Sequence, residues 1–87
     1  MEAIQVDFDS ETAAVTVTAE AAPRNWQDIC ESYDNDVHRV RDVDDHPGYT
    51  GLYVCYDQDN QPHHYIVAED AALQRLRRRT FFKKLGK

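Results

Sequence analysis

The chain has 87 residues, of which 41% are hydrophobic, with three prolines and three glycines. This length and composition predict one folded domain spanning residues 1–87, and they exclude both a multi-domain enzyme and a disordered chain. Sixteen acidic residues against ten lysines and arginines give a net charge of −6, so we expect an acidic exterior that repels nucleic acid and attracts basic surfaces.

The charges are unevenly distributed along the chain. Residues 1–74 contain all sixteen acidic residues and three arginines, a net charge of −13, whereas residues 75–87 contain seven basic residues and no acidic one. The N-terminus lacks a basic segment followed by an apolar one, and the longest apolar run has five residues. With only two cysteines and no CxxC spacing, these features predict a cytoplasmic protein without a signal peptide or a membrane span.

The first half of the chain predicts a hairpin and a helix. Apolar residues alternate with polar ones over 4–8 and 13–17, which is typical of two paired strands. Asn25 can then cap a short amphipathic helix, in which Trp26, Ile29, Cys30 and Tyr33 share one face. Residues 37–43 predict a further strand, although valines at every third position fit neither period.

The second half predicts a loop, a second hairpin and a final helix. Turn-forming residues crowd 44–51, and β-rich runs at 52–57 and 63–68 flank a polar turn. Acidic residues at 69–70 and basic residues further on are typical of the two ends of a helix, here the last element. The predicted order is ββαβββα, an α+β fold with a mostly antiparallel sheet and helices packed on one face.

The sequence has few candidates for catalysis. If Asp59 and Asn60 form the centre of the second turn, Cys55 faces His64 across the hairpin, the minimal pairing for a thiol nucleophile. We expect a packed cross-strand pair instead, because no third group is marked. Adjacent histidines at 63 and 64 point to opposite faces of a strand, so we expect no metal site and no cofactor.

One part of the chain resembles the opening of the GIY-YIG nucleases. The segments Gly51-Leu52-Tyr53 and Tyr65-Ile66-Val67, followed by Arg75-Leu76, match its hairpin with two tyrosines and the arginine on the next helix. The resemblance covers about 25 residues. It implies metal-assisted phosphodiester cleavage, with Tyr53 or Tyr65 near the nucleophile and Arg75 on a phosphate. Val67 stands where that family has glycine.

The function predicted from these features is a non-enzymatic interaction protein, an inhibitor or nucleic-acid mimic, whose acidic face binds a basic protein partner. Carboxylates would speed the encounter and a loop tyrosine would supply buried contact area. The predicted partner-binding residues are Asp34, Asp36, Asp42, Asp44, Asp45, Tyr49, Asp57 and Asp59. Self-association through an exposed sheet edge is a further possibility.

The alternative function is nucleic-acid binding by the basic C-terminal helix, with nuclease activity if the GIY-YIG resemblance holds. Its candidate residues are Arg75, Arg77, Arg78, Arg79, Lys83 and Lys84. Seven cations within thirteen residues could contact several phosphates. The same charges could instead fold back over the acidic body, which would leave no coherent negative surface.

Overall fold

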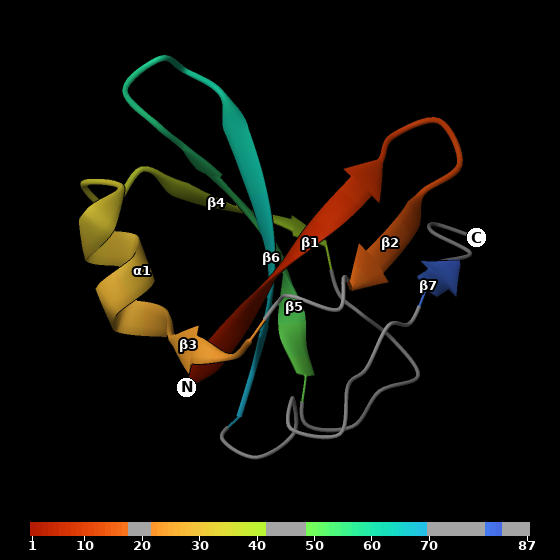
Figure 1. Ribbon diagram of the computed structural model, residues 1–87, viewed down its shortest axis with the longest axis horizontal. Helices are drawn as coiled ribbons and strands as arrows, with labels where there is room; N and C mark the ends of the chain where they lie inside the picture. The colour runs from red at the N-terminus through yellow and green to blue at the C-terminus, as the bar shows by residue number, and fades with distance from the viewer. Residues whose placement is uncertain (18–21, 42–48, 70–79, 83–87) are drawn as a thin grey trace.

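The computed structural model describes residues 1–17, 22–41, 49–69 and 80–82 (Figure 1). All pairings between its strands are antiparallel, and the strands follow the order β4-β5-β6-β1-β2-β7, with β3 also paired to β1. The elements are β1 (Glu2–Asp9), β2 (Ala14–Val17), β3 (Arg24–Asn25), α1 (Trp26–Ser32), β4 (Val37–Arg41), β5 (Tyr49–Tyr56), β6 (Pro62–Ala68) and β7 (Thr80–Phe82).

The predicted α+β class is wrong. The described residues form mostly antiparallel sheet, with a single helix of seven residues. Thr80–Phe82, expected inside a final helix, form β7 and pair with β2. A β-branched residue and two aromatic residues suit a strand, and β2 offers them backbone partners, so pairing outweighs the helical spacing of the surrounding sequence. The short β3 was not expected.

The first hairpin and the helix cap are confirmed. In the turn between β1 and β2, the Asp9 carboxylate accepts the backbone N–H of Glu11, at 2.9 Å, and Ala13 adopts a left-handed conformation with φ of 64°. Asn25 caps α1 by accepting the N–H of Asp28 at 3.0 Å. Local side chains thus define both elements, as the sequence predicted.

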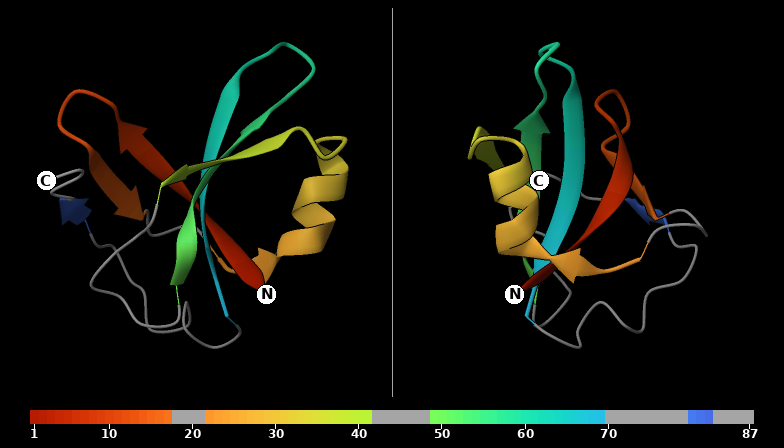
Figure 2. Two further views of the ribbon diagram at one scale, coloured as in Figure 1. Left: turned by 180° about the vertical axis from the view of Figure 1, so that it is seen from behind. Right: turned by 60° about the vertical axis from the view of Figure 1, so that its left-hand side comes forward.

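The two faces of the sheet carry different cores. One face is aliphatic and consists of Ile4, Val6, Val15, Val17, Leu52, Ile66 and Ala68, with Phe8 packed against it. The other face is covered by α1, whose Ile29 is fully buried, and it is lined by Ala3, Cys55, Tyr65 and Val67 with Trp26, Tyr33, Val37 and Tyr53 around them. Figure 2 shows α1 along that side of the sheet.

The sheet is strongly curved on its aliphatic face. The Arg41 guanidinium at the end of β4 lies 5.9 Å from the centre of the Phe8 ring and donates to the Ala13 carbonyl at 3.4 Å. These two partners belong to the β1–β2 hairpin, from which β5 and β6 separate β4 in the sheet. Contact across two intervening strands requires the sheet to curl, as Figure 2 shows from behind.

The second hairpin exists, but its predicted register is wrong by one residue. Cys55 pairs with His63, and Tyr56 with Pro62. The loop has three residues rather than two: Asp57 N–H donates to the Gln61 carbonyl at 3.1 Å, and Asn60 is left-handed with φ of 62°. A turn followed by a left-handed residue is the usual three-residue hairpin loop, and here it decides which side chains face each other.

No helix within the described ranges has the length and apolar character needed to cross a membrane.

Candidate functional site: an acidic hollow

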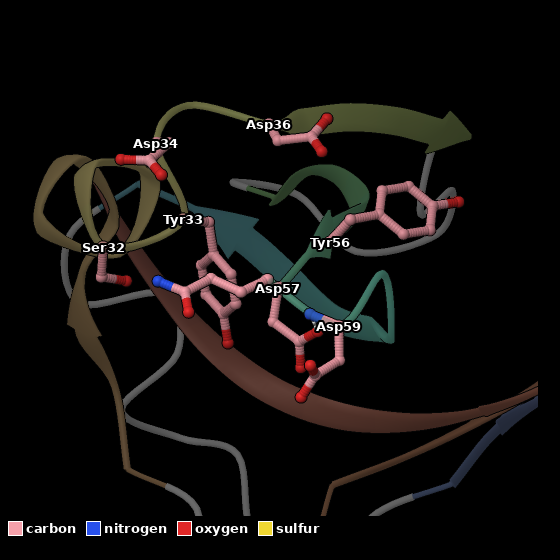
Figure 3. A pocket seen from close by; sticks show the side chains of 8 residues that line it. Ser32, Tyr33, Asp34, Asp36, Tyr56, Asp57 and Asp59 are labelled. Atoms are coloured by element: carbon pink, nitrogen blue, oxygen red, sulfur yellow. Dashed lines mark hydrogen bonds between the residues drawn. The ribbon is translucent and has the colours of Figure 1, made fainter.

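A hollow of about 420 Å³ opens between the turn that follows α1 and the hairpin loop between β5 and β6 (Figure 3). We call it the acidic hollow, because four of the eight described residues around it are aspartates and none of these eight is a lysine or an arginine. Its lining consists of Ser32, Tyr33, Asp34, Asp36, Tyr56, Asp57, Gln58 and Asp59. Two segments separated in sequence by the whole of β4 and most of β5 therefore supply one site.

One side of the hollow is built by the C-terminal end of α1. Asp34 and Asn35 both adopt left-handed conformations, and the N–H of Asn35 donates to the Cys30 carbonyl at 2.8 Å. Asx residues tolerate this conformation better than other non-glycine residues, so they can end a helix in this way. The Asp36 carbonyl then accepts the N–H of Tyr56 at 3.2 Å, which joins the turn to β5.

The other side is held together by Asp57. One carboxylate oxygen accepts the backbone N–H groups of Asp59 and Gln61, each at 2.9 Å, and the other oxygen accepts from His63 Nε2 at 2.8 Å. These hydrogen bonds, the one from His63 first, hold the pKa of Asp57 below its ordinary value. Asp57 therefore stays ionised at neutral pH, but both of its carboxylate oxygens already accept hydrogen bonds within the hairpin.

The other three carboxylates of the hollow are exposed, and they differ in their hydrogen bonds. Asp36 bonds His38 Nε2 at 2.8 Å, a contact between two largely exposed side chains. The side chains of Asp34 and Asp59 make no hydrogen bond or ion pair with another described residue, and both face solvent. These two carboxylates are the acceptors most accessible to a bound cation.

Two tyrosines give the hollow an apolar component. The Tyr33 hydroxyl lies 3.1 Å from that of Tyr65, and its ring lies 5.5 Å from the ring of His63. The Tyr56 ring meets His38 edge-on at 5.8 Å. The sequence analysis did not include either tyrosine among the partner-binding residues. Each adjoins an aspartate in a turn, and that adjacency is the signal that could have identified them.

Of the predicted partner-binding residues, the structure brings four together: Asp34, Asp36, Asp57 and Asp59. Tyr49 does not join them, because it begins β5 and Tyr56 ends it, about 23 Å apart along an extended strand. Asp42, Asp44 and Asp45 lie outside the described residues. So do all six candidates for nucleic-acid contact, which are Arg75, Arg77, Arg78, Arg79, Lys83 and Lys84.

The candidates for catalysis are placed apart from the hollow or are buried. Cys55 is fully buried, and burial raises its pKa to about 12, so the thiol stays protonated. It does not face His64, which lies on the opposite face of the sheet, 5.0 Å from the Phe8 ring, where burial lowers its pKa. The described residues contain no cluster of metal-ligating side chains.

The two tyrosines of the GIY-YIG resemblance face each other across β5 and β6. Tyr53 pairs with Tyr65, and both rings contact Trp26 of α1. Tyr65 is 2% exposed, and burial raises the pKa of its hydroxyl. Arg75 falls outside the described part of the chain. The buried, protonated phenol of Tyr65 is thus not positioned to reach a phosphodiester, whereas Tyr53 is half-buried.

Comparison of the chain with protein-family models, with curated proteins and with solved structures finds no match.

Proposed function

We propose that the protein is a non-enzymatic interaction module that binds a basic segment of a protein partner in the acidic hollow. The observation that carries this proposal is the convergence of Asp34 and Asp36 with Asp57 and Asp59 around one concavity. Carboxylates scattered over a surface serve solubility, whereas carboxylates around a hollow with aromatic walls form a place for a cationic side chain.

The charge of the hollow supports a cationic ligand. Within the described part of the chain, none of its lining residues is a lysine or an arginine, and the imidazoles that bond Asp36 and Asp57 approach from outside the lining. Low-dielectric walls on a concave site concentrate its field, which raises the encounter rate with positively charged partners. The two exposed carboxylates, Asp34 and Asp59, can then each accept a hydrogen bond from the ligand.

The tyrosines support arginine as the residue that is bound. A guanidinium can lie against an aromatic ring while it donates in its own plane to carboxylates, and Tyr33 and Tyr56 stand beside such carboxylates. A lysine ammonium has no flat face to stack and is more strongly hydrated. The proposed mechanism is therefore electrostatic steering, followed by seating of an arginine between a ring and the aspartates.

The test compares two double variants of equal charge. D34N/D59N neutralises the accessible carboxylates of the hollow, whereas D7N/E11Q neutralises two exposed acidic residues of the β1–β2 hairpin. Affinity for a fluorescent hexa-arginine peptide is measured by anisotropy at several salt concentrations. At about 0.5 kcal/mol for each exposed charge contact, D34N/D59N should weaken binding about fivefold and flatten its salt dependence.

The affinity of the control variant should lie within about twofold of the wild-type affinity, because only the long-range electrostatic field changes. If both variants weaken binding equally, the peptide responds to the net charge of the protein and not to the hollow, and the proposal is overturned. Amide shifts mapped by NMR during the same titration should concentrate on residues 33–36 and 56–59. A hexa-lysine peptide should bind more weakly than hexa-arginine if the tyrosines take part.

Nucleic-acid binding by residues 75–87 stays a prediction from the sequence. A gel shift with single- and double-stranded DNA at physiological salt separates it from the proposal, since retention lost on neutralising the six basic residues would favour the C-terminal segment.

A further inference from the structure

Two of the four carboxylates of the acidic hollow are hydrogen-bonded to histidines. His38 Nε2 lies 2.8 Å from a carboxylate oxygen of Asp36, and His63 Nε2 lies 2.8 Å from one of Asp57. The two aspartates belong to the two sides of the hollow, Asp36 to the turn after α1 and Asp57 to the hairpin loop (Figure 3). Both imidazoles stand outside the lining, so they border the site without filling it.

The geometry of both pairs suits either protonation state of the imidazole. A neutral ring and an imidazolium can both donate from Nε2 to a carboxylate, so protonation adds a positive charge while the contact stays in place. Histidine is the side chain whose charge ordinarily changes between about pH 5 and 8. Above this range a ligand meets four carboxylates, and below it two positive charges stand beside them.

Around His63, the neighbouring elements leave Asp57 as the charged partner within the hollow. The ring of Tyr33, in the turn after α1, lies 5.5 Å from the His63 ring, and Cys55 of β5 is the register partner of His63. Hydrogen bonds, the one from His63 first, hold the pKa of Asp57 below its ordinary value, and burial raises the pKa of Cys55 to about 12. Between about pH 5.5 and 7.5 the carboxylate is therefore charged and the thiol is neutral.

On the remaining sides, His63 adjoins β1 and its own neighbour on β6. The register pairs Val6 with His64, so the exposed Asp7 of β1 lies next to His63. His64 points to the opposite face, where burial and the neighbouring His63 lower its pKa and keep its ring neutral over more of this range. Among the described residues, a proton on His63 is thus gained between Asp57 and Asp7.

His38 has a simpler environment. Its side chain is largely exposed, with Asp36 bonded to it and the Tyr56 ring of β5 edge-on at 5.8 Å. The next residue of β4, Arg39, points to the other face and donates to the Thr50 carbonyl at 2.8 Å. Because Asp36 and Tyr56 both line the hollow, a charge on His38 acts directly on the site.

We propose that the acidic hollow is pH-sensitive, so that it binds a basic segment at about pH 7.5 and releases it as His38 and His63 take up protons toward about pH 5.5. This inference rests on the function proposed above. Each imidazolium repels the bound arginine, and the two together should weaken binding about fivefold. By reciprocity, binding of the cation expels protons from the two histidines.

The experiment measures affinity for fluorescent hexa-arginine by anisotropy between about pH 7.5 and 5.5 at constant ionic strength. The peptide keeps its charge, because a guanidinium does not lose its proton in this range. Wild-type protein should bind about fivefold more weakly at the lower pH. H38Q/H63Q should bind equally at both, since glutamine takes up no proton. Calorimetry in two buffers of different ionisation enthalpy should show proton release on binding to wild-type protein only.

The matched control is H64L, which removes the third described histidine, on the opposite face of the sheet. Its loss of affinity between the two pH values should lie within about twofold of the wild-type loss. His46 lies outside the described residues and is present in every variant. Circular dichroism at each pH checks that the proteins are folded. If H38Q/H63Q does not fold, H38Q alone decides, because it should reduce the fivefold loss to about twofold.

The outcomes separate this inference from the function on which it rests. If hexa-arginine binds at about pH 7.5 and its affinity does not fall toward pH 5.5, the pH sensitivity is overturned and the proposed function stands. Equal losses in wild-type protein and H38Q/H63Q also overturn it, as does a pH dependence that H64L abolishes. If hexa-arginine does not bind at about pH 7.5, both proposals are overturned.

Discussion

Leu52 and Tyr56 lie four residues apart on β5, and their surroundings differ completely. Leu52 is fully buried in the aliphatic core, whereas Tyr56 stands half-buried on the rim of the acidic hollow. At the centre of the sheet, strands hold one another through apolar packing. At the rim, two turns are held by hydrogen bonds, and the carboxylates that remain accessible do little for the fold. Stability and the proposed binding therefore depend on different residues of this chain.

The largest effect on stability is expected at the centre of the sheet. L52A removes a buried side chain from the aliphatic core and should lower the free energy of unfolding by about 3 kcal/mol. Urea denaturation monitored by the fluorescence of Trp26 measures it. The control V40A alters an exposed side chain and should cost less than about 0.5 kcal/mol. Equal costs would mean that Leu52 is not packed as described.

An intermediate effect is expected at Asp57, the aspartate of the hollow whose carboxylate accepts the backbone N–H groups of the hairpin loop. D57A removes the acceptor of three hydrogen bonds and should lower Tm, since two backbone N–H groups of the turn lose their partner. D57N keeps an oxygen acceptor and should lower Tm less. D59N, at a side chain without such bonds, should leave Tm unchanged. If D59N is as destabilising as D57A, the division between structural and accessible carboxylates fails.

The smallest effect concerns pH. Burial lowers the pKa of His64 in the folded state, so the unfolded chain binds its proton more readily, and His64 should make the protein less stable as pH falls through about 6.5 toward the lower folded value. Asp57 works in a separate window: its lowered pKa contributes stability that is lost only in acid, as pH falls below about 3.8.

Urea denaturation between pH 5 and 7.5 measures the contribution of His64. H64L removes the titrating group and keeps an apolar contact for Phe8, so the free energy of unfolding should change less with pH than in the unchanged protein. H38Q, at an exposed histidine, serves as the control. If the free energy of unfolding of H64L changes with pH as steeply as that of the wild-type protein, the pH dependence does not come from protonation of His64.

The parts of the fold that were predictable are those specified by neighbouring residues. The alternation in 4–8 and 13–17 identified the first hairpin, and Asn25 identified the start of α1. The register of the second hairpin was missed by one residue, because it depends on Asp57 accepting two turn N–H groups and on Asn60 adopting a left-handed conformation. Several types of turn were compatible with the polar residues of this loop, and the side-chain hydrogen bonds select one of them.

The sequence by itself determined the composition of the surface, the strand periodicity and the local caps, because charge, alternation and capping act over a few residues. Only the tertiary structure decided that Thr80–Phe82 pair with β2, that the sheet curls, and that Asp34 and Asp36 meet Asp57 and Asp59. These features depend on contacts between segments far apart in the chain. Such contacts depend on how the whole sheet is assembled, which local preference does not specify.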